Sequence, residues 1–221
     1  MANAQPMVLH ADPGTCLASK IALWRQPWAG THDRGGDQLT TLSTDQRVAI
    51  VLGRRFGGNQ ADWRISRDIH GRPTLAAEHG LDLSISHAGN CWMLAASGGG
   101  RRLGVDIETP RPLPRALALA ERYFPANELA LLERLAPAAR ARAFLRLWCA
   151  REAILKAHGR GIAFGLSRLT LELTPTRICM LDCDPELGAP ADWRLREFVP
   201  QRGMIGMLAW QGPPARIRGL V

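Results

Sequence analysis

The middle of the chain alternates apolar and polar residues in a way that predicts β-strands. Between residues 81 and 86 every second residue is apolar, which is the spacing of a half-buried strand, and His87 follows at its end. Two more apolar segments, residues 91–96 and Leu103–Glu108, come after glycine-containing turn signals. We expect these three strands to form an antiparallel meander in which consecutive strands pair.

Helical spacing occurs on both sides of this block. Thr44–Phe56 is predicted to form a helix that ends at the pair Gly57-Gly58, and residues 138–158 form a stronger helical pattern that ends at Gly159. Further strands are predicted at residues 168–173, 178–182, 193–199 and 204–210. Because helices and antiparallel strands are segregated and do not strictly alternate, the pattern indicates an α+β fold.

Composition places the chain among packed globular proteins. Its 221 residues are 46% hydrophobic and 22% charged, enough for one large domain or for two halves of about 110 residues. No apolar run reaches the roughly 18–20 residues that cross a bilayer, and residues 1–10 lack a basic segment followed by an apolar one. We therefore expect a cytoplasmic protein, with its five cysteines reduced.

The charge balance indicates an anionic partner. Lysine and arginine number 28 against 20 aspartates and glutamates, a net charge of +8 that is nearly all arginine. Arginine suits bidentate contact with phosphate, but charge alone leaves a nucleic acid, an acidic protein and a phosphorylated small molecule equally open. A genome that prefers arginine codons would explain the same excess.

Two carboxylates are predicted on one face of the strand Leu103–Glu108. The apolar residues of this strand share one face, so Gly104, Asp106 and Glu108 share the other. The two acids lie roughly 6–7 Å apart along the strand and could converge on one cation, and hard oxygen ligands suit magnesium. Gly104 is expected to leave room for a ligand beside them. The alternative is an edge strand with two solvated acids.

The later helix carries a second polar group of residues. Trp148, Glu152 and Lys156 fall at positions i, i+4 and i+8, and so line one face of an otherwise mostly apolar segment. The alternative is an ordinary surface ion pair of Glu152 and Lys156, with Arg151 and His158 on a neighbouring solvated face. This segment alone does not decide between the two interpretations.

Together these motifs resemble those of the larger, surfactin-synthetase-activator type of 4′-phosphopantetheinyl transferase. The Gly-x-Asp-x-Glu motif of that family is residues 104–108 here, and its Trp-x-x-Lys-Glu-Ala-x-x-Lys motif is residues 148–156, about forty residues later. A Gly-x-Gly follows at Gly159-Arg160-Gly161. Residues 122–124 and Glu128 resemble the segment that joins the two acidic motifs.

Upstream motifs extend the resemblance from about Arg47 to Gly161. Gly71-Arg72-Pro73 stands where the family has Gly-Lys-Pro, and residues 84–87 match its Ser-His element. Arg72 and Arg151 replace lysines that are common in the family. Both replacements keep the positive charge but change the geometry of the donors.

The resemblance implies a fold and a reaction. The fold is two similar α+β halves with antiparallel sheets, residues 1–103 and 104–221, which form a pseudo-dimer with the active site in the cleft between them. The enzyme would be a holo-[acyl-carrier-protein] synthase. It would transfer the 4′-phosphopantetheine arm of coenzyme A to a serine hydroxyl of an apo acyl or peptidyl carrier protein and release adenosine 3′,5′-bisphosphate.

The resemblance also implies the partners. Coenzyme A and an acidic carrier protein are expected, nucleic acid and membrane are not, and a monomer is the expected state. Residues 111–132 are expected either to form part of the carrier dock or, more conservatively, to pack Leu117 and Leu119 against the sheet. A magnesium-dependent nuclease or phosphohydrolase is the alternative function. A nucleic-acid-binding module is less favoured, because the chain has one tyrosine and its tryptophans are dispersed.

The roles of the site residues follow from the motif positions. Asp106, Glu108 and Glu152 are expected to hold magnesium, or manganese in its place. Glu152 is the catalytic candidate to accept the serine proton, directly or through a water, and Lys156 is the candidate to neutralise the charge of the pyrophosphate. The expected contacts to coenzyme A are Arg47, Arg72, Ser86, His87 and Lys156.

Overall fold

The computed structural model of the protein describes residues 20–27 and 42–219. The prediction made for residues 1–10 lies outside them, as does Cys16. The helices are α2 Thr44–Phe56, α3 Ala116–Tyr123, α4 Ala126–Glu133 and α5 Pro137–His158, with short 3₁₀ helices at Gln60–Trp63, Ala77–His79, Gly161–Phe164, Pro185–Leu187 and Pro190–Asp192. The strands are β1 Lys20–Pro27, β2 Ser66–Arg67, β3 Pro73–Thr74, β4 Leu81–Ala88, β5 Cys91–Gly98, β6 Leu103–Glu108, β7 Leu169–Leu173, β8 Ile178–Cys183, β9 Trp193–Phe198, β10 Ile205–Gln211 and β11 Arg216–Arg218. No helix in the described ranges is long and apolar enough to cross a membrane.

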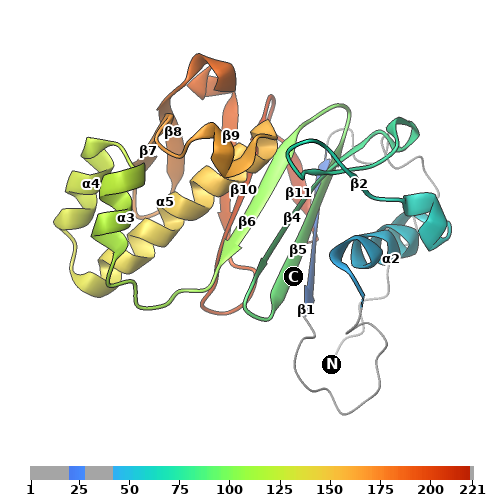
Figure 1. Cartoon of the computed structure of the whole chain (residues 1–221), viewed down its shortest axis with the longest axis horizontal. Helices are drawn as coiled ribbons and strands as arrows, with labels where there is room; N and C mark the ends of the chain where they lie inside the picture. The colour runs from blue at the N-terminus through green and yellow to red at the C-terminus, as the bar shows by residue number, and fades with distance from the viewer. Residues whose placement is uncertain (1–19, 28–41, 220–221) are drawn as a thin grey trace, which may run out of the picture.

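Two main sheets lie side by side (Figure 1). The first has the strand order β11-β1-β5-β4 and the second β6-β10-β9, while β2-β3 and β7-β8 form separate two-stranded ribbons. All pairings are antiparallel except that between β1 and β11. The predicted α+β fold with antiparallel sheets is therefore confirmed, and the predicted helices and strands occur within a few residues of their expected bounds.

The third strand of the predicted meander is a correction. β4 and β5 pair as expected, but β6 leaves this sheet and pairs with β10 instead. The edge of β6 that faces β4 is satisfied by side chains, because alternate residues of β4 accept its backbone N–H groups. The bonded pairs are Leu103 with Asp82, Val105 with Ser84 and Ile107 with Ser86, at 2.8, 3.0 and 3.2 Å.

This row of bonds, which we call the β4–β6 seam, joins the two sheets. Because the pairs advance by two residues on both strands, β4 and β6 run parallel at the seam. Direct backbone pairing of β6 with β5 was predicted from the turn signals alone. From alternation alone, the polar residues of β4 are expected to face solvent. In the structure they accept hydrogen bonds from β6 instead, so the sequence pattern did not predict the seam.

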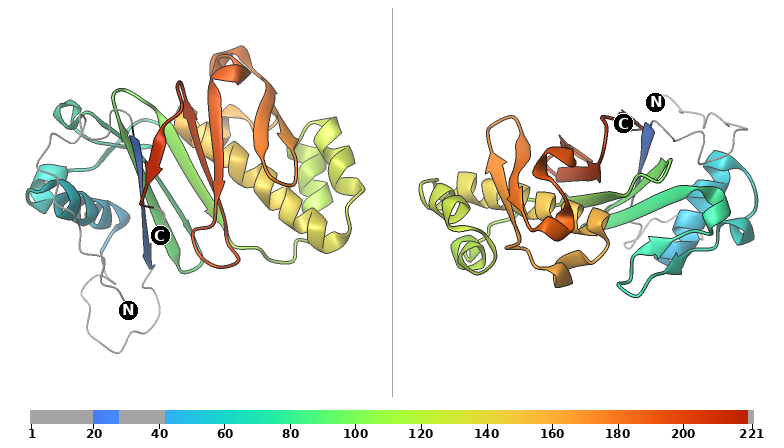
Figure 2. Two further views of the ribbon diagram at one scale, coloured as in Figure 1. Left: turned by 180° about the vertical axis from the view of Figure 1, so that it is seen from behind. Right: turned by 90° about the horizontal axis from the view of Figure 1, so that it is seen from above.

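The core consists of three layers of apolar side chains. One lies between α2 and the outer face of the first sheet, with Val48 and Leu52 against Leu94. The second lies between the two sheets, and the third packs α5 against the second sheet, where Met207 is fully buried. The order is therefore helix, sheet, sheet, helix, and Figure 2 shows α2 beside the first sheet and α5 across the second.

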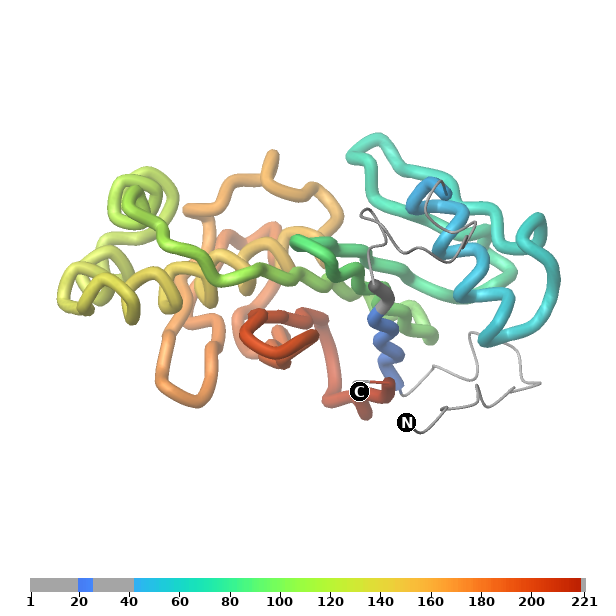
Figure 3. The backbone as a smooth tube through the Cα atoms, turned by 90° about the horizontal axis from the view of Figure 1, so that it is seen from below, coloured from blue at the N-terminus to red at the C-terminus, as the bar shows by residue number. Residues whose placement is uncertain are grey.

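Strands from both ends of the described chain meet in the first sheet. β1 pairs with β11 in parallel, with Ile21 opposite Ile217, and Figure 3 shows the last described residues, in red, near the blue β1. The first sheet thus includes a strand that belongs to the second predicted half. The boundary at residues 103 and 104 lies within β6, and the division into two halves stays a prediction.

Helix α5 packs so closely on β6 that Gly104 has no room for a side chain. The helix has Pro137 in its first turn and ends at Gly159, whose φ of 100° favours glycine. A Cβ on Gly104 would overlap the Ala153 carbonyl oxygen and lie 2.6 Å from the Ala157 nitrogen. The interpretation that Gly104 leaves room for a ligand is therefore wrong, because the helix backbone takes that space.

We expect Gly104→Ala to destabilise the protein by about 1–3 kcal/mol or more, the usual cost of adding an atom to a filled core. The clash is with backbone, which cannot rotate away as a side chain would. Urea unfolding followed by circular dichroism measures the change. An unaltered midpoint would contradict the close contact between β6 and α5.

Candidate active site

An acidic cluster forms where α5 crosses β6. Asp106 is 6% exposed, and its Oδ1 accepts hydrogen bonds from Lys156 Nζ at 2.7 Å and Ser86 Oγ at 2.8 Å. Its Oδ2 is buried and accepts no hydrogen bond within the described part of the chain. Ser86 comes from β4, so the cluster draws on β4, β6 and α5 together.

Glu108 and Glu152 are close enough to Asp106 for its negative charge to affect their pKa values. Burial, followed by the negative charge of Asp106, raises the pKa of Glu152 from 4.5 to about 7. The same two causes raise the pKa of Glu108, although Arg111 and Lys156 act in the opposite direction. Glu152 is only 9% exposed, so three acids share one low-dielectric region with the ammonium of Lys156.

The solvated-surface alternative for α5 is wrong. Lys156 pairs with Asp106 of β6, and Glu152 is buried. Arg151 is fully buried, where its Nη2 contacts Glu128 Oε1 at 2.6 Å. All three side chains are therefore held by tertiary packing, in positions that helical spacing alone could not distinguish from a solvated face.

The chemistry of the cluster fits a divalent cation. Carboxylate oxygens are the ligands that magnesium prefers, and the buried Oδ2 of Asp106 has no hydrogen-bond partner among the described residues. The pKa of Glu152 is raised by burial first and by the negative charge of Asp106 second, so a cation would offset the repulsion between these two acids. As the side chains stand, no three His, Cys, Asp or Glu residues in the described ranges are grouped closely enough to hold a metal ion. Lys156 takes one oxygen of Asp106 in this arrangement.

The raised pKa of Glu152 predicts a pH dependence of stability. Between its unfolded value near 4.5 and its folded value of about 7, the folded protein binds more protons, so this contribution is lost as the pH rises through about 7. With EDTA present we expect the free energy of unfolding to fall by up to ~3 kcal/mol from this group between pH 5 and pH 8. Urea titrations of the wild type and Glu152→Gln should differ in this slope, and equal slopes would contradict the shift.

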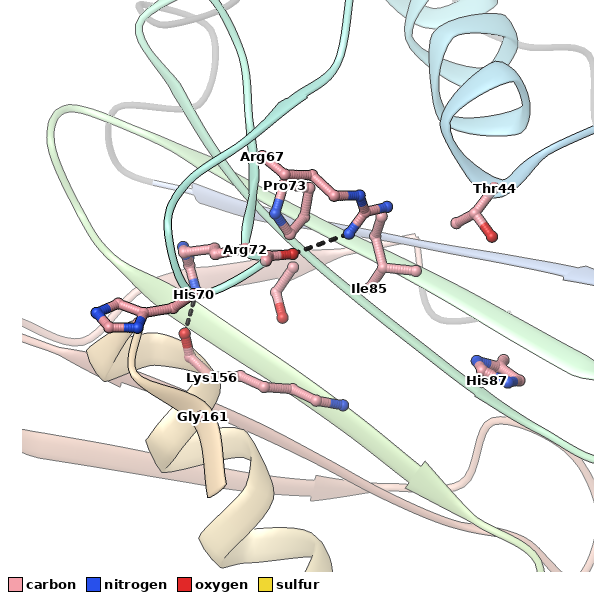
Figure 4. A pocket seen from close by; sticks show the side chains of 12 residues that line it. Thr44, Arg67, His70, Arg72, Pro73, Ile85, His87, Lys156 and Gly161 are labelled. Atoms are coloured by element: carbon pink, nitrogen blue, oxygen red, sulfur yellow. Dashed lines mark hydrogen bonds between the residues drawn. The ribbon is translucent and has the colours of Figure 1, made fainter. Parts of the chain in front are cut away.

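A pocket of about 340 Å³ opens beside Lys156 (Figure 4). It lies between the β2–β3 hairpin, the start of α2, β4 and the end of α5. Its lining residues are Thr44, Arg67, His70, Gly71, Arg72, Pro73, Ser84, Ile85, His87, Lys156, Gly159 and Gly161. These residues include two arginines, one lysine and two histidines, and none of them is acidic, so the pocket suits an anionic ligand.

The structure brings together most of the predicted coenzyme contacts. Arg72, His87 and Lys156 line the pocket, and Ser86 is buried beside it with a hydrogen bond from Lys156 Nζ at 3.2 Å. Arg47 lies on α2, is half-buried, and donates from Nε to the Leu42 carbonyl oxygen at 3.2 Å; it is not among the lining residues.

Arg72 has an architectural role. Its guanidinium donates to the carbonyl oxygen of Lys156 (Figure 4) and to that of Leu103, and it pairs with Asp82. Arg72 therefore connects the start of β3 with α5, β6 and β4. Its side chain is 6% exposed. Burial lowers the pKa of Arg72 and, against the attraction of Arg72, raises the pKa of Asp82.

Sequence reasoning missed three residues of the pocket: Thr44, Arg67 and His70. Arg67 pairs with Pro73 in the β2–β3 ribbon, and His70 immediately precedes the Gly-Arg-Pro motif. A hairpin assignment for residues 66–74 would have brought Arg67 next to that motif. Both strands are only two residues long, which is too short to show alternation.

The segment of residues 111–132 packs against α5. α3 and α4 lie beside the first half of α5, and Leu117 and Leu119 contact its apolar core. The two leucines therefore pack in the interior as the conservative interpretation expected, but α3 packs mainly with α4 and α5 rather than on the sheet. Participation of the segment in carrier docking stays a prediction.

A cluster of acids beside a pocket lined with cations is typical of enzymes that act on phosphate esters. Comparison with known proteins identifies which enzymes. Residues 102–202 match the sequence profile of the 4′-phosphopantetheinyl transferase superfamily. The chain is 31% identical over 222 residues to 4′-phosphopantetheinyl transferase HetI of Nostoc sp. (strain PCC 7120), a match that covers 90% of each chain.

Two further relatives carry the same description. Sfp of Bacillus subtilis (strain 168) is 28% identical over 137 residues, 62% of this chain and 59% of that protein. AcpT of Salmonella typhi is 36% identical over 138 residues, 55% of this chain and 71% of that protein. The chain belongs to the 4′-phosphopantetheinyl transferase superfamily and is a transferase, as the motifs predicted. None of these three relatives supports the nuclease alternative.

Proposed function

We propose that the enzyme transfers the 4′-phosphopantetheine arm of coenzyme A to a serine of an apo carrier protein and releases adenosine 3′,5′-bisphosphate. The observation that carries this proposal is the meeting of Asp106 with Lys156 and Ser86 beside a pocket without acidic lining residues. Coenzyme A carries a diphosphate and a separate 3′-phosphate, and such a ligand needs a cationic pocket.

The acids would hold magnesium, or manganese, through Asp106, Glu108 and Glu152. When bound, the cation would polarise the phosphate oxygens and stabilise the charge of the leaving group. Lys156, which lines the pocket, would bind the diphosphate with its ammonium. Phosphoryl transfer depends mainly on positioning and charge neutralisation, so these groups are chemically sufficient.

Glu152 would take the proton from the carrier serine. In the metal-free protein, burial and then the negative charge of Asp106 raise the pKa of Glu152 to about 7, and a bound cation would lower it, so the carboxylate would be ionised and able to accept a proton at neutral pH. His87, at the end of β4, lines the pocket, where its ring would contact a coenzyme phosphate. Ser86 would contact a phosphate only by exchanging the hydrogen bond that its hydroxyl donates to Asp106 for one to the phosphate. Arg47 would act at the adenosine end, near Thr44 of the pocket lining.

The two-half architecture belongs to the same proposal. In residues 20–27 and 42–102 a helix covers the outer face of the first sheet, and in residues 103–219 another covers the outer face of the second. This arrangement supports two similar halves, residues 1–103 and 104–221, related as a pseudo-dimer. The active site would lie in the cleft between them, next to the β4–β6 seam.

The carrier protein would dock on the segment of residues 111–132. At the start of this segment, a groove of about 700 Å³ lies between residues 110–114 and the first half of α5, and its lining includes Leu113, Leu145, Arg111 and Arg142. It begins at Pro110, two residues after Glu108. An acidic carrier with an exposed apolar helix would complement both features.

Incubation with coenzyme A, magnesium and a panel of apo acyl and peptidyl carrier proteins tests the proposal. We expect intact-protein mass spectrometry to show the gain of one phosphopantetheine arm on the carrier, with no gain when EDTA is present or when the carrier serine is alanine. Nucleic-acid cleavage without carrier modification would instead support the nuclease alternative. The panel also shows which carrier the enzyme serves.

A further inference from the structure

The charges that line the pocket are not equally available to a ligand. Lys156 is paired with Asp106, and Arg72 is enclosed by Asp82 and two carbonyl oxygens. The side chain of Arg67, in contrast, is 44% exposed and also lines the pocket. The two arginines of this hairpin therefore differ in role: Arg67 is open to the pocket, and the guanidinium of Arg72 is bound within the protein interior.

The guanidinium of Arg67 is held in place from two sides. Its Nη1 donates to the Gly71 carbonyl oxygen at 2.9 Å, across its own hairpin, and its Nη2 contacts Asp45 Oδ1 of α2 at 2.5 Å. Figure 4 shows this side chain on the side of the pocket nearer Thr44. The pair with Asp45 is exposed to solvent and therefore weak, so a phosphate can compete for the guanidinium at little cost.

We propose that Arg67, and not Arg72, is the cation of the β2–β3 hairpin that contacts a phosphate group of coenzyme A. Arg72 belongs to the Gly-Arg-Pro motif, but its guanidinium donates hydrogen bonds to Lys156, Leu103 and Asp82 within the protein. Arg67, opposite Pro73 in the ribbon, brings a positive charge to the same wall of the pocket. Arg72 is the positioning residue that fixes the end of α5. This inference rests on the proposed function, in which the pocket binds coenzyme A.

Kinetics and direct binding test the proposal together. For Arg67→Gln we expect KM and Kd for coenzyme A to rise about 10-fold to 100-fold, the range for one hydrogen bond to a charged group, with kcat and Tm nearly unchanged. Arg64→Gln removes the same charge from an exposed position outside the pocket lining and serves as the matched control. Arg72→Gln should mainly lower Tm.

Comparison with 3′-dephospho-coenzyme A identifies the phosphate. If the 3′-phosphate is the ligand, Arg67→Gln weakens coenzyme A and leaves the dephospho form unaffected; if the diphosphate is the ligand, both weaken equally. Asp45→Asn frees the guanidinium and should leave Kd unchanged or lower it. A rise equal to that of Arg67→Gln would show that the ion pair only anchors the hairpin, and would overturn the proposal.

The outcomes separate this inference from the proposed function. Unchanged KM and Kd in Arg67→Gln, with normal transfer by the wild type, would overturn the role of Arg67 alone. Absence of transfer to any carrier would overturn the proposed function. Calorimetric Kd values for coenzyme A and the variants would then still decide whether Arg67 contacts a phosphate.

Discussion

Replacing Glu152 with glutamine is expected to lower transfer by at least ~100-fold, the range for removal of a positioned general base. Glutamine keeps the size of the side chain but can neither accept the serine proton nor add negative charge for a divalent cation. Single-turnover transfer at saturating coenzyme A, carrier and magnesium measures the loss. Near-normal turnover would refute the role assigned to Glu152.

The same substitution should leave the fold intact. Burial, followed by the negative charge of Asp106, raises the pKa of Glu152, so removal of its charge relieves both a desolvation cost and repulsion. At pH 8 in EDTA we therefore expect Glu152→Gln to unfold at the same temperature as the wild type or higher. Glu78→Gln removes one carboxylate from an exposed position and should change neither turnover nor Tm. Loss of activity together with a lowered Tm would indicate a structural role instead.

Breaking the buried Arg151–Glu128 pair is expected to have the largest effect on stability. The guanidinium stacks 4.2 Å from the centre of the Phe124 ring and also donates to the carbonyl oxygens of Leu166 and Leu169. Arg151→Met would leave the Glu128 carboxylate buried without its partner, which costs about 3–5 kcal/mol. For a chain of this size that is a fall in Tm of roughly 6–20 °C.

A double-mutant cycle separates this pair from catalysis. Replacing both residues, as Arg151→Met with Glu128→Gln, should restore much of the lost stability, because no unpaired charge then remains in the core and the glutamine oxygen can still accept the hydrogen bond from the Leu171 backbone N–H. Arg151→Lys, which installs the residue common in the family, should be intermediate, since an ammonium cannot make all these contacts at once. Below the Tm of each variant, kcat should stay within a few-fold of the wild type. Lost turnover in Arg151→Met without lost stability would place Arg151 at the reaction.

The pocket depends on contacts across the two sheets as much as on its own lining. The β4–β6 seam holds Ser86 beside Asp106, and Arg72 holds the end of α5 against β6. Ser86 serves both purposes, since its hydroxyl accepts from Ile107 and donates to Asp106. The hydrogen bonds that join the two sheets therefore also position the side chains of the site.

The sequence by itself determined the helix Thr44–Phe56, the long helix that ends at Gly159, the predicted strands and the acidic motifs. These features depend on local spacing, capping and turn residues, which act within a few positions along the chain. The family resemblance came from the order of short motifs, and the comparisons confirmed it.

Tertiary structure alone decided which polar groups serve packing and which face the pocket. Three motif residues serve packing. Gly104 lets the backbone of α5 approach β6, and Arg72 and Arg151 donate hydrogen bonds to buried acceptors. Arg67 lies outside every motif and faces the pocket. Residue spacing shows only which residues share a face of one helix or strand. The roles of these residues depend on contacts with distant segments, which form only when the two sheets come together.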